Sequence, residues 1–112
     1  MNNDLKYRID ESNRILSKFP YHIPVIVKSD SIIKLKKTKF LVPRDVNASY
    51  LNIAIRKQME NVDSSKAIFM FCGKNLICGN HMMHQIYDEY IKSKNDRDLF
   101  LYITLSIENT FG

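Results

Sequence analysis

The sequence has no tryptophan and only three glycines, three prolines and two cysteines in 112 residues. So little glycine and proline excludes collagen and low-complexity chains, and two cysteines are too few for a disulfide-stapled scaffold. The longest apolar run, from Ala67 to Cys72, is far shorter than the ~20 residues of a membrane-spanning helix. The start, from Met1 to Asp4, is not that of a signal peptide. We therefore expect one soluble intracellular domain whose two thiols are reduced.

The composition is that of an ordinary globular chain, with 45% hydrophobic and 26% charged residues. A chain of this length can bury a single core without metal or disulfide support. Its net charge of +5 is unevenly distributed, because the first 44 residues hold ten lysines and arginines against four acids. A basic first half favours an acidic partner, which could be nucleic acid, an anionic membrane or acidic peptides.

Hydrophobic periodicity predicts three helices and five strands. The helices are expected over 4–18, 48–60 and about 81–90, and the strands over 23–27, 39–42, 67–72, 76–77 and 99–107. Asn47 and Asn80 are good helix caps before the second and third helices.

The order of these elements favours an α+β fold. After the first helix, a mixed sheet of four or five strands wrapped over one helix, the ubiquitin-like β-grasp, fits the order, with its first and last strands parallel and central. Pro24 cannot donate a hydrogen bond within a ladder, so it indicates a bulge or an edge in the first strand. A free strand edge beside lysines suits the capture of an extended acidic peptide.

Four potential zinc ligands occur with the spacing C-x5-C-x2-H-x2-H, namely Cys72, Cys78, His81 and His84. The paired cysteines of structural zinc sites usually have about two to four residues between them, which does not match. A cysteine nucleophile has no better support, since neither thiol has cations at a helix start beside it. We therefore expect no metal and no cofactor.

Catalytic chemistry finds no other support in the chain. The acids that could form carboxylate pairs flank the end of the last helix, in a stretch expected to be solvated: Asp88, Glu89, Asp96 and Asp98. A glycine-rich phosphate loop is absent from the sequence. We do not expect an enzyme.

The basic run from Lys34 to Lys39, followed by Phe40, could suggest a nucleic-acid patch. Single-strand readers, however, interleave aromatic and basic side chains on a sheet, and that pattern is missing here. We expect no nucleic-acid partner.

Segments along nearly the whole chain resemble the autophagy ubiquitin-like modifiers of the GABARAP type. In chain order they are Glu11-Ser12-x-Arg14-Ile15, Phe19-Pro20-x-x-Ile23-Pro24-Val25-Ile26, Lys39-Phe40-Leu41-Val42-Pro43, Ile55-Arg56-Lys57, Lys66-Ala67-Ile68-Phe69-Met70-Phe71, Ile86-Tyr87-x-Glu89, Phe100-Leu101-Tyr102-Ile103-Thr104 and Glu108-Asn109-Thr110-Phe111-Gly112. The resemblance implies a β-grasp domain over 21–107, an N-terminal helical extension over 1–20 and a flexible conjugation tail over 108–112.

The resemblance also implies a tag rather than an enzyme. In the family, ATP activates the terminal glycine, which passes through thioesters to the amine of phosphatidylethanolamine. Gly112 would be the lipid-attachment residue here, at the end of a tail formed by Glu108, Asn109, Thr110 and Phe111. A terminus without a side chain can pass along a narrow active-site channel.

A second activity implied by the resemblance is docking of aromatic-x-x-aliphatic peptides as an added strand. The aromatic pocket would be formed by Glu11, Ile15, Pro24, Ile26, Lys39, Leu41 and Phe100. The aliphatic pocket would be formed by Phe40, Val42, Pro43, Val46, Tyr50, Ile53 and Arg56. Lys39 and Arg56 would pair with acids that flank the peptide motif. Phe69 and Phe71 match a further docking face.

The partners implied are the activating and conjugating enzymes, a processing or delipidating cysteine protease, motif-bearing receptors or adaptors, and phosphatidylethanolamine membranes. A monomer in the cytoplasm and on autophagosomal or vesicle membranes is expected. If the composition reflects a protist, a plastid membrane is a further candidate. Two alternatives remain open, a modifier of protein lysines and an unconjugated adaptor that binds microtubules or nucleic acid.

Two departures from the family pattern stand out. His22 lies where the family usually has arginine, which weakens charge-dependent contacts at that position. Ile107 replaces the glycine usual before the tail and is expected to stiffen its exit.

Overall fold

A computed structural model describes residues 3–29, 32–60, 65–93 and 98–107. The elements run in the order α1 (Asn3–Lys18), β1 (His22–Ser29), β2 (Lys39–Pro43), α2 (Ala48–Arg56), β3 (Ile68–Cys72), β4 (Asn75–Ile77), α3 (Met83–Ser93) and β5 (Leu101–Ile107). The predicted conjugation tail over 108–112 lies outside the described residues. None of the described helices is long and apolar enough to cross a membrane.

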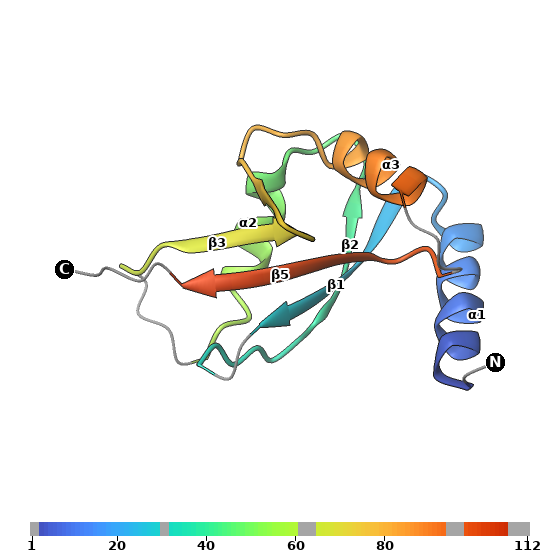
Figure 1. Cartoon of the computed structure of the whole chain (residues 1–112), viewed down its shortest axis with the longest axis horizontal. Coiled ribbons are helices and arrows are strands. Elements are labelled where there is room, and N and C mark those ends of the chain that lie inside the picture. The colour runs from blue at the N-terminus through green and yellow to red at the C-terminus, as the bar shows by residue number, and fades with distance from the viewer. Residues whose placement is uncertain (1–2, 30–31, 61–64, 94–97, 108–112) are drawn as a thin grey trace.

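The five strands form one mixed sheet in the order β2-β1-β5-β3-β4. Strands β1 and β5 are parallel neighbours, with Val25 opposite Leu101, and all other pairs are antiparallel. The predicted β-grasp arrangement, with the first and last strands parallel and central, is confirmed. Figure 1 shows α1 at one end of the molecule and the carboxyl end of β5 at the other.

The core lies on one face of the sheet, beneath α2 and α3. Alternate strand residues enter it, because successive side chains of a strand point to opposite faces. Among them are Val25 of β1, Val42 of β2 and Ile103 of β5, each at most 2% exposed. The fully buried Leu51 of α2 and Met83 of α3 belong to the same apolar cluster. The opposite face is therefore the one that α1 and solvent can cover.

Pro24 was predicted to mark a bulge or an edge, and the edge is wrong, because β1 lies inside the sheet between β2 and β5. Val27 donates its backbone N–H to the Thr38 carbonyl, at 2.8 Å. Since hydrogen-bonded pairs alternate along an antiparallel ladder, the nitrogen of Pro24 points toward β5 instead. The parallel pairing with β5 begins only at Val25, so the missing donor leaves no ladder bond unmade there.

Two predicted helix boundaries also need correction. Helix α2 ends at Arg56 rather than at residue 60, because the chain beyond it pairs with the loop after β1. Lys36 donates its backbone N–H to the Gln58 carbonyl at 2.8 Å, which takes these residues out of the helical pattern. Helix α3 begins at Met83, whose backbone N–H reaches the Val46 carbonyl at 2.9 Å. Asn80 therefore lies in a turn and does not cap the helix.

Candidate functional site

The outer edge of β2 is the first candidate surface, since β2 has β1 on one side and no strand on the other in the described sheet. The pairs Val27–Thr38 and Tyr21–Arg44 carry the hydrogen bonds to β1. By the alternation of an antiparallel ladder, the backbone groups of Lys39 and Leu41 point away from β1, toward the edge. An extended peptide could pair with this edge as a further strand.

Most residues of the predicted aromatic pocket lie together on the face of the sheet opposite the core. Pro24 lies opposite Leu41, and Ile26 lies opposite Lys39, in the β1–β2 register. Leu41 is 36% exposed and Lys39 is exposed, whereas Pro24 is fully buried. Phe100, next to the start of β5, is 1% exposed, so it belongs to the floor beneath this surface.

Helix α1 joins this cluster through an ion pair. The Lys39 ammonium donates to both oxygens of the Glu11 carboxylate, at 3.0 and 3.1 Å. Ile15 follows Glu11 by one helical turn and is half-buried, so both side chains lie on the same side of α1. Five of the seven predicted residues thus retain exposed surface on this side of the molecule, and Pro24 and Phe100 are buried beneath them.

The residues of the predicted aliphatic pocket do not all lie together. Phe40 and Val42 are 8% and 1% exposed and point into the core beneath α2. Pro43 and Val46, after and beyond the strand, are half-buried. Tyr50 is 48% exposed on α2. These residues could form only the floor and rim of a depression at the edge of β2.

Ile53 lies elsewhere. Its side chain is 57% exposed and lines a groove of about 480 Å³ between α2 and the β3–β4 hairpin. Phe69, half-buried on β3, lines the same groove. Phe71 is also half-buried but does not line it. The structure therefore groups Ile53 with the second docking face rather than with the edge of β2.

Arg56 is held at the end of α2 by two hydrogen bonds. Its guanidinium donates to the Lys66 carbonyl at 2.8 Å and to the Asn52 side-chain oxygen at 3.3 Å. A peptide acid near Arg56 would have to share this cation with groups that already accept from it. Lys39 is likewise already paired, with the Glu11 carboxylate.

Cysteine and histidine side chains do not assemble a metal centre in the part of the chain described here. No group of three or more potential ligands is close enough to hold an ion among these residues. Cys72 is half-buried at the end of β3, and Cys78 is exposed. The imidazole of His81 instead accepts a hydrogen bond from the Cys78 backbone N–H, at 3.3 Å.

The expectation that Asp98 is solvated is wrong, because its side chain is 2% exposed. Phe100 donates its backbone N–H and Tyr102 its hydroxyl to this carboxylate, at 3.1 and 3.0 Å. The Arg8 guanidinium of α1 completes the group at 3.4 Å. Burial raises the pKa of Tyr102 to about 12, and the hydrogen bond to Asp98 adds to the shift.

The same segment binds α1 and α3 through Leu99. Its backbone N–H donates to the buried hydroxyl of Ser12, at 2.9 Å, and its carbonyl accepts from the Tyr87 hydroxyl, at 2.6 Å. Burial also raises the pKa of Tyr87 to about 12. Local sequence patterns could not predict these contacts, because a serine on a polar helix gives no local sign of a partner 87 residues away. The other predicted acids differ: Asp88 is exposed and pairs with Arg44 at 2.7 Å, Glu89 is exposed, and Asp96 lies outside the described residues.

Comparison with known sequences identifies the family to which this chain is similar. The family described as "Autophagy protein Atg8 ubiquitin like" matches residues 7–112. "Autophagy-related protein 8e" of Arabidopsis thaliana is 39% identical over 115 aligned positions, covering 100% of this chain and 90% of the relative. "Autophagy-related protein 8" of Dictyostelium discoideum is 40% identical, covering 96% of this chain and 88% of the relative.

Solved structures show the same fold. The crystal structure of Trypanosoma brucei ATG8 superposes with a TM-score of 0.79 at 25% identity, covering 96% of this chain and 91% of that one. Plasmodium falciparum Atg8, solved with a Plasmodium falciparum Atg3 peptide, gives a TM-score of 0.73 at 23% identity, covering 91% and 89%. The resemblance to the autophagy modifiers is confirmed, and this chain belongs to the Atg8 family of ubiquitin-like autophagy proteins.

Proposed function

We propose that the chain is a modifier that is joined through Gly112 to the amine of phosphatidylethanolamine and acts in autophagosome formation. The observation that carries the proposal is the extent of the family match, which runs to residue 112 and so includes the tail over 108–112. The chain acts as a tag and not as an enzyme, in the cytoplasm and on autophagosomal or vesicle membranes. It works as a monomer, with the tail following a domain over 21–107 and a helical extension over 1–20.

The chemistry requires an outside source of energy. A carboxylate does not form an amide with an amine unaided, so ATP first converts the Gly112 carboxylate to an adenylate with release of pyrophosphate. An enzyme thiol attacks the adenylate and releases AMP, which forms a thioester. The lipid amine then attacks the thioester and releases the thiol, which forms the amide. The absence of a side chain on Gly112 leaves the carbonyl open to both displacements.

The enzyme partners are an activating and a conjugating enzyme, with a cysteine protease that removes the tag from the lipid. The Plasmodium falciparum Atg8 structure, which contains an Atg3 peptide, supports a partner from the conjugation cascade.

Docking of aromatic-x-x-aliphatic peptides is the second part of the proposal. The outward backbone groups of Lys39 and Leu41 would supply main-chain hydrogen bonds, and the surface beneath α1 would take the aromatic side chain. The half-buried Pro43 and Val46 would contact the aliphatic side chain. Acidic residues beside the motif would be attracted by Lys39, which increases the association rate more than the affinity.

The deciding experiment incubates the chain with its cognate activating and conjugating enzymes, ATP and phosphatidylethanolamine vesicles. Intact-mass measurement is expected to show an ATP-dependent adduct of one lipid on the full chain and none on a copy that lacks Gly112. An adduct with a protein lysine in place of the lipid would identify a protein modifier. If enzymes that load a control modifier never load this chain, the proposed conjugation is wrong.

A further inference from the structure

The loop over 32–38, here called the basic loop, combines cations with an exposed apolar side chain. Residues 28–39 contain five lysines and one aspartate. Lys36 and Lys37 are exposed, and the side chain of Ile32 is 65% exposed. An exposed apolar side chain beside lysines offers the two kinds of contact, apolar and electrostatic, that favour binding at an anionic lipid surface.

The fold fixes the basic loop at the end of the molecule where β5 ends. Because β1 and β5 are parallel, their carboxyl ends meet at the same edge, with Ser29 opposite Leu105. The basic loop follows β1, and the Lys36 backbone holds it to the Gln58 carbonyl. Figure 1 shows this segment on the side where β5 ends, with α1 at the far end.

The length of the tail limits how far this end can be from a lipid attached to Gly112. β5 ends at Ile107, and only five residues follow it. Five residues span at most about 17 Å when fully extended. The edge that carries the basic loop therefore cannot move far from the bilayer, whereas α1 can.

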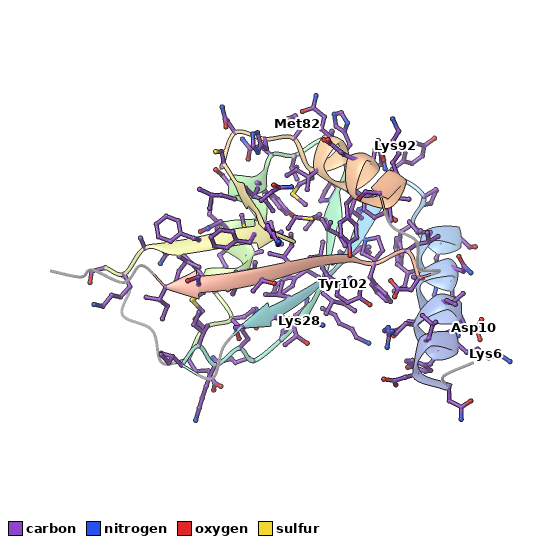
Figure 2. The ribbon with its side chains drawn as sticks, in the orientation of Figure 1. Lys6, Asp10, Lys28, Met82, Lys92 and Tyr102 are labelled. Atoms are coloured by element: carbon purple, nitrogen blue, oxygen red, sulfur yellow. The ribbon has the colours of Figure 1, made fainter. Side chains whose placement is uncertain are left out.

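Two lysines near this edge lie over aromatic rings, one on each face of the sheet, because Phe40 points into the core and Tyr102 points away from it. Figure 2 shows Lys28 beside Tyr102, with its ammonium 5.2 Å from the ring centroid. The Lys37 ammonium lies 5.2 Å from the centroid of the Phe40 ring. By contrast, Lys6 and Lys92 lie at the other end of the molecule in the same view.

We propose that the basic loop docks on the bilayer to which the chain is attached and that it prefers anionic phospholipid, with Ile32 entering the headgroup region. This inference rests on the proposed conjugation of Gly112 and adds the lipid class and the orientation of the domain. Each lysine close to an anionic surface raises the ratio of docked to undocked chain roughly fivefold. Docking in this orientation leaves the edge of β2 and α1 free for peptides.

The absence of tryptophan from the chain provides a direct test. Ile32→Trp introduces a single reporter, whose emission moves to shorter wavelength on entering a bilayer interface. The chain is attached chemically, through Gly112→Cys with Cys72→Ala and Cys78→Ser, to maleimide-bearing lipid. The vesicles contain phosphatidylcholine alone or with phosphatidylserine. We expect the emission shift on vesicles with phosphatidylserine and a much smaller one on phosphatidylcholine alone.

Two matched pairs of substitutions separate the loop from net charge. Lys36→Gln with Lys37→Gln is expected to lower the ratio of docked to undocked chain roughly 30-fold. Lys6→Gln with Lys92→Gln removes the same charge at the far end and is expected to leave the ratio within about twofold. A Tyr7→Trp reporter on α1 is expected to show no shift, and circular dichroism verifies that each variant is folded.

Three results would overturn the inference: no difference between the two lipid mixtures, equal effects of the two lysine pairs, or a shift at residue 7 instead of residue 32. If a single-stranded oligonucleotide shifts the Ile32→Trp emission and anionic vesicles do not, the loop serves nucleic acid and the inference is wrong. The lipid is attached without enzymes, so the outcome is independent of the conjugation assay. Failure of one experiment therefore leaves the other interpretable.

Discussion

Leu99 donates its backbone N–H to the hydroxyl of Ser12 across 2.9 Å, although 87 positions separate the two residues. Ser12 is fully buried and its hydroxyl donates in turn to the Ile9 carbonyl, at 3.1 Å. One hydroxyl thus links the middle of α1 to the segment that leads into β5. Helix α1 is therefore fixed to the sheet by specific hydrogen bonds as well as by apolar contact.

Ser12→Ala is expected to lower the free energy of unfolding by about 1–2 kcal/mol, because it leaves the Leu99 N–H without its acceptor. Urea unfolding followed by circular dichroism measures the loss. Ser17→Ala, on the exposed side of α1, is the matched control and is expected to change stability by less than about 0.5 kcal/mol. Equal effects of the two substitutions would show that the Ser12 bond does not stabilise the fold.

The raised pKa values of Tyr87 and Tyr102, both about 12, predict loss of stability in alkali. In the unfolded chain a tyrosine ionises near pH 10, so the folded state binds more protons between about pH 10 and 12. The stabilisation is complete below pH 10 and decreases as pH rises toward 12. Urea midpoints measured across this range are expected to fall, and Tyr102→Phe is expected to make the fall shallower. Tyr21→Phe, at a side chain 78% exposed, is the matched control, and an identical change there would contradict the assignment.

Two exposed aliphatic side chains distinguish the candidate docking surfaces. Leu41→Ala, at the edge of β2, is expected to weaken binding of an aromatic-x-x-aliphatic peptide about tenfold or more, because it removes apolar contact area. Ile53→Ala, in the groove beside Phe69, is expected to change the affinity by about twofold or less. Isothermal titration calorimetry measures both. The reverse order would move peptide docking to the groove between α2 and the β3–β4 hairpin.

The ion pair between Glu11 and Lys39 predicts opposite effects of neutralising its members. Glu11→Gln releases the Lys39 ammonium and is expected to raise the association rate of an acid-flanked peptide roughly two- to fivefold at low salt. Lys39→Gln is expected to lower that rate by a similar factor. Stopped-flow fluorescence over a range of salt concentrations measures both, and the differences are expected to shrink as salt screens the charges. Rates that do not depend on salt would exclude a role for this pair in peptide capture.

Gly73 is the residue of the β3–β4 turn that requires a positive φ, of 62°. Gly73→Ala is expected to destabilise the fold by about 1 kcal/mol through backbone strain alone, since a Cβ there would meet no atom within 4 Å. Gly73→Asn is expected to cost less, because asparagine tolerates the left-handed region. Thermal unfolding compares the two variants, and an equal loss would show that strain in the left-handed region is not the cause.

Local sequence patterns were sufficient to predict the helices and strands and the face of the sheet to which many side chains point. The alternation over 39–42 predicts a strand, and the structure places Phe40 and Val42 in the core with Lys39 and Leu41 on the other face. The same reasoning was wrong about Pro24. A proline in the sequence shows only that its own backbone N–H is missing. Whether a neighbouring strand needs that donor depends on where β5 begins to pair with β1.

The sequence by itself determined the α+β fold class, the three helices, the basic first half of the chain and the family pattern of residues 108–112. Hydrophobic periodicity and turn residues act over a few positions, and so they are readable locally. Only the tertiary structure decided that Asp98 is buried against α1, that Ile53 lies beside Phe69, and that the basic loop shares an end with β5. These relationships join residues far apart in sequence, because strand order and helix packing bring them together.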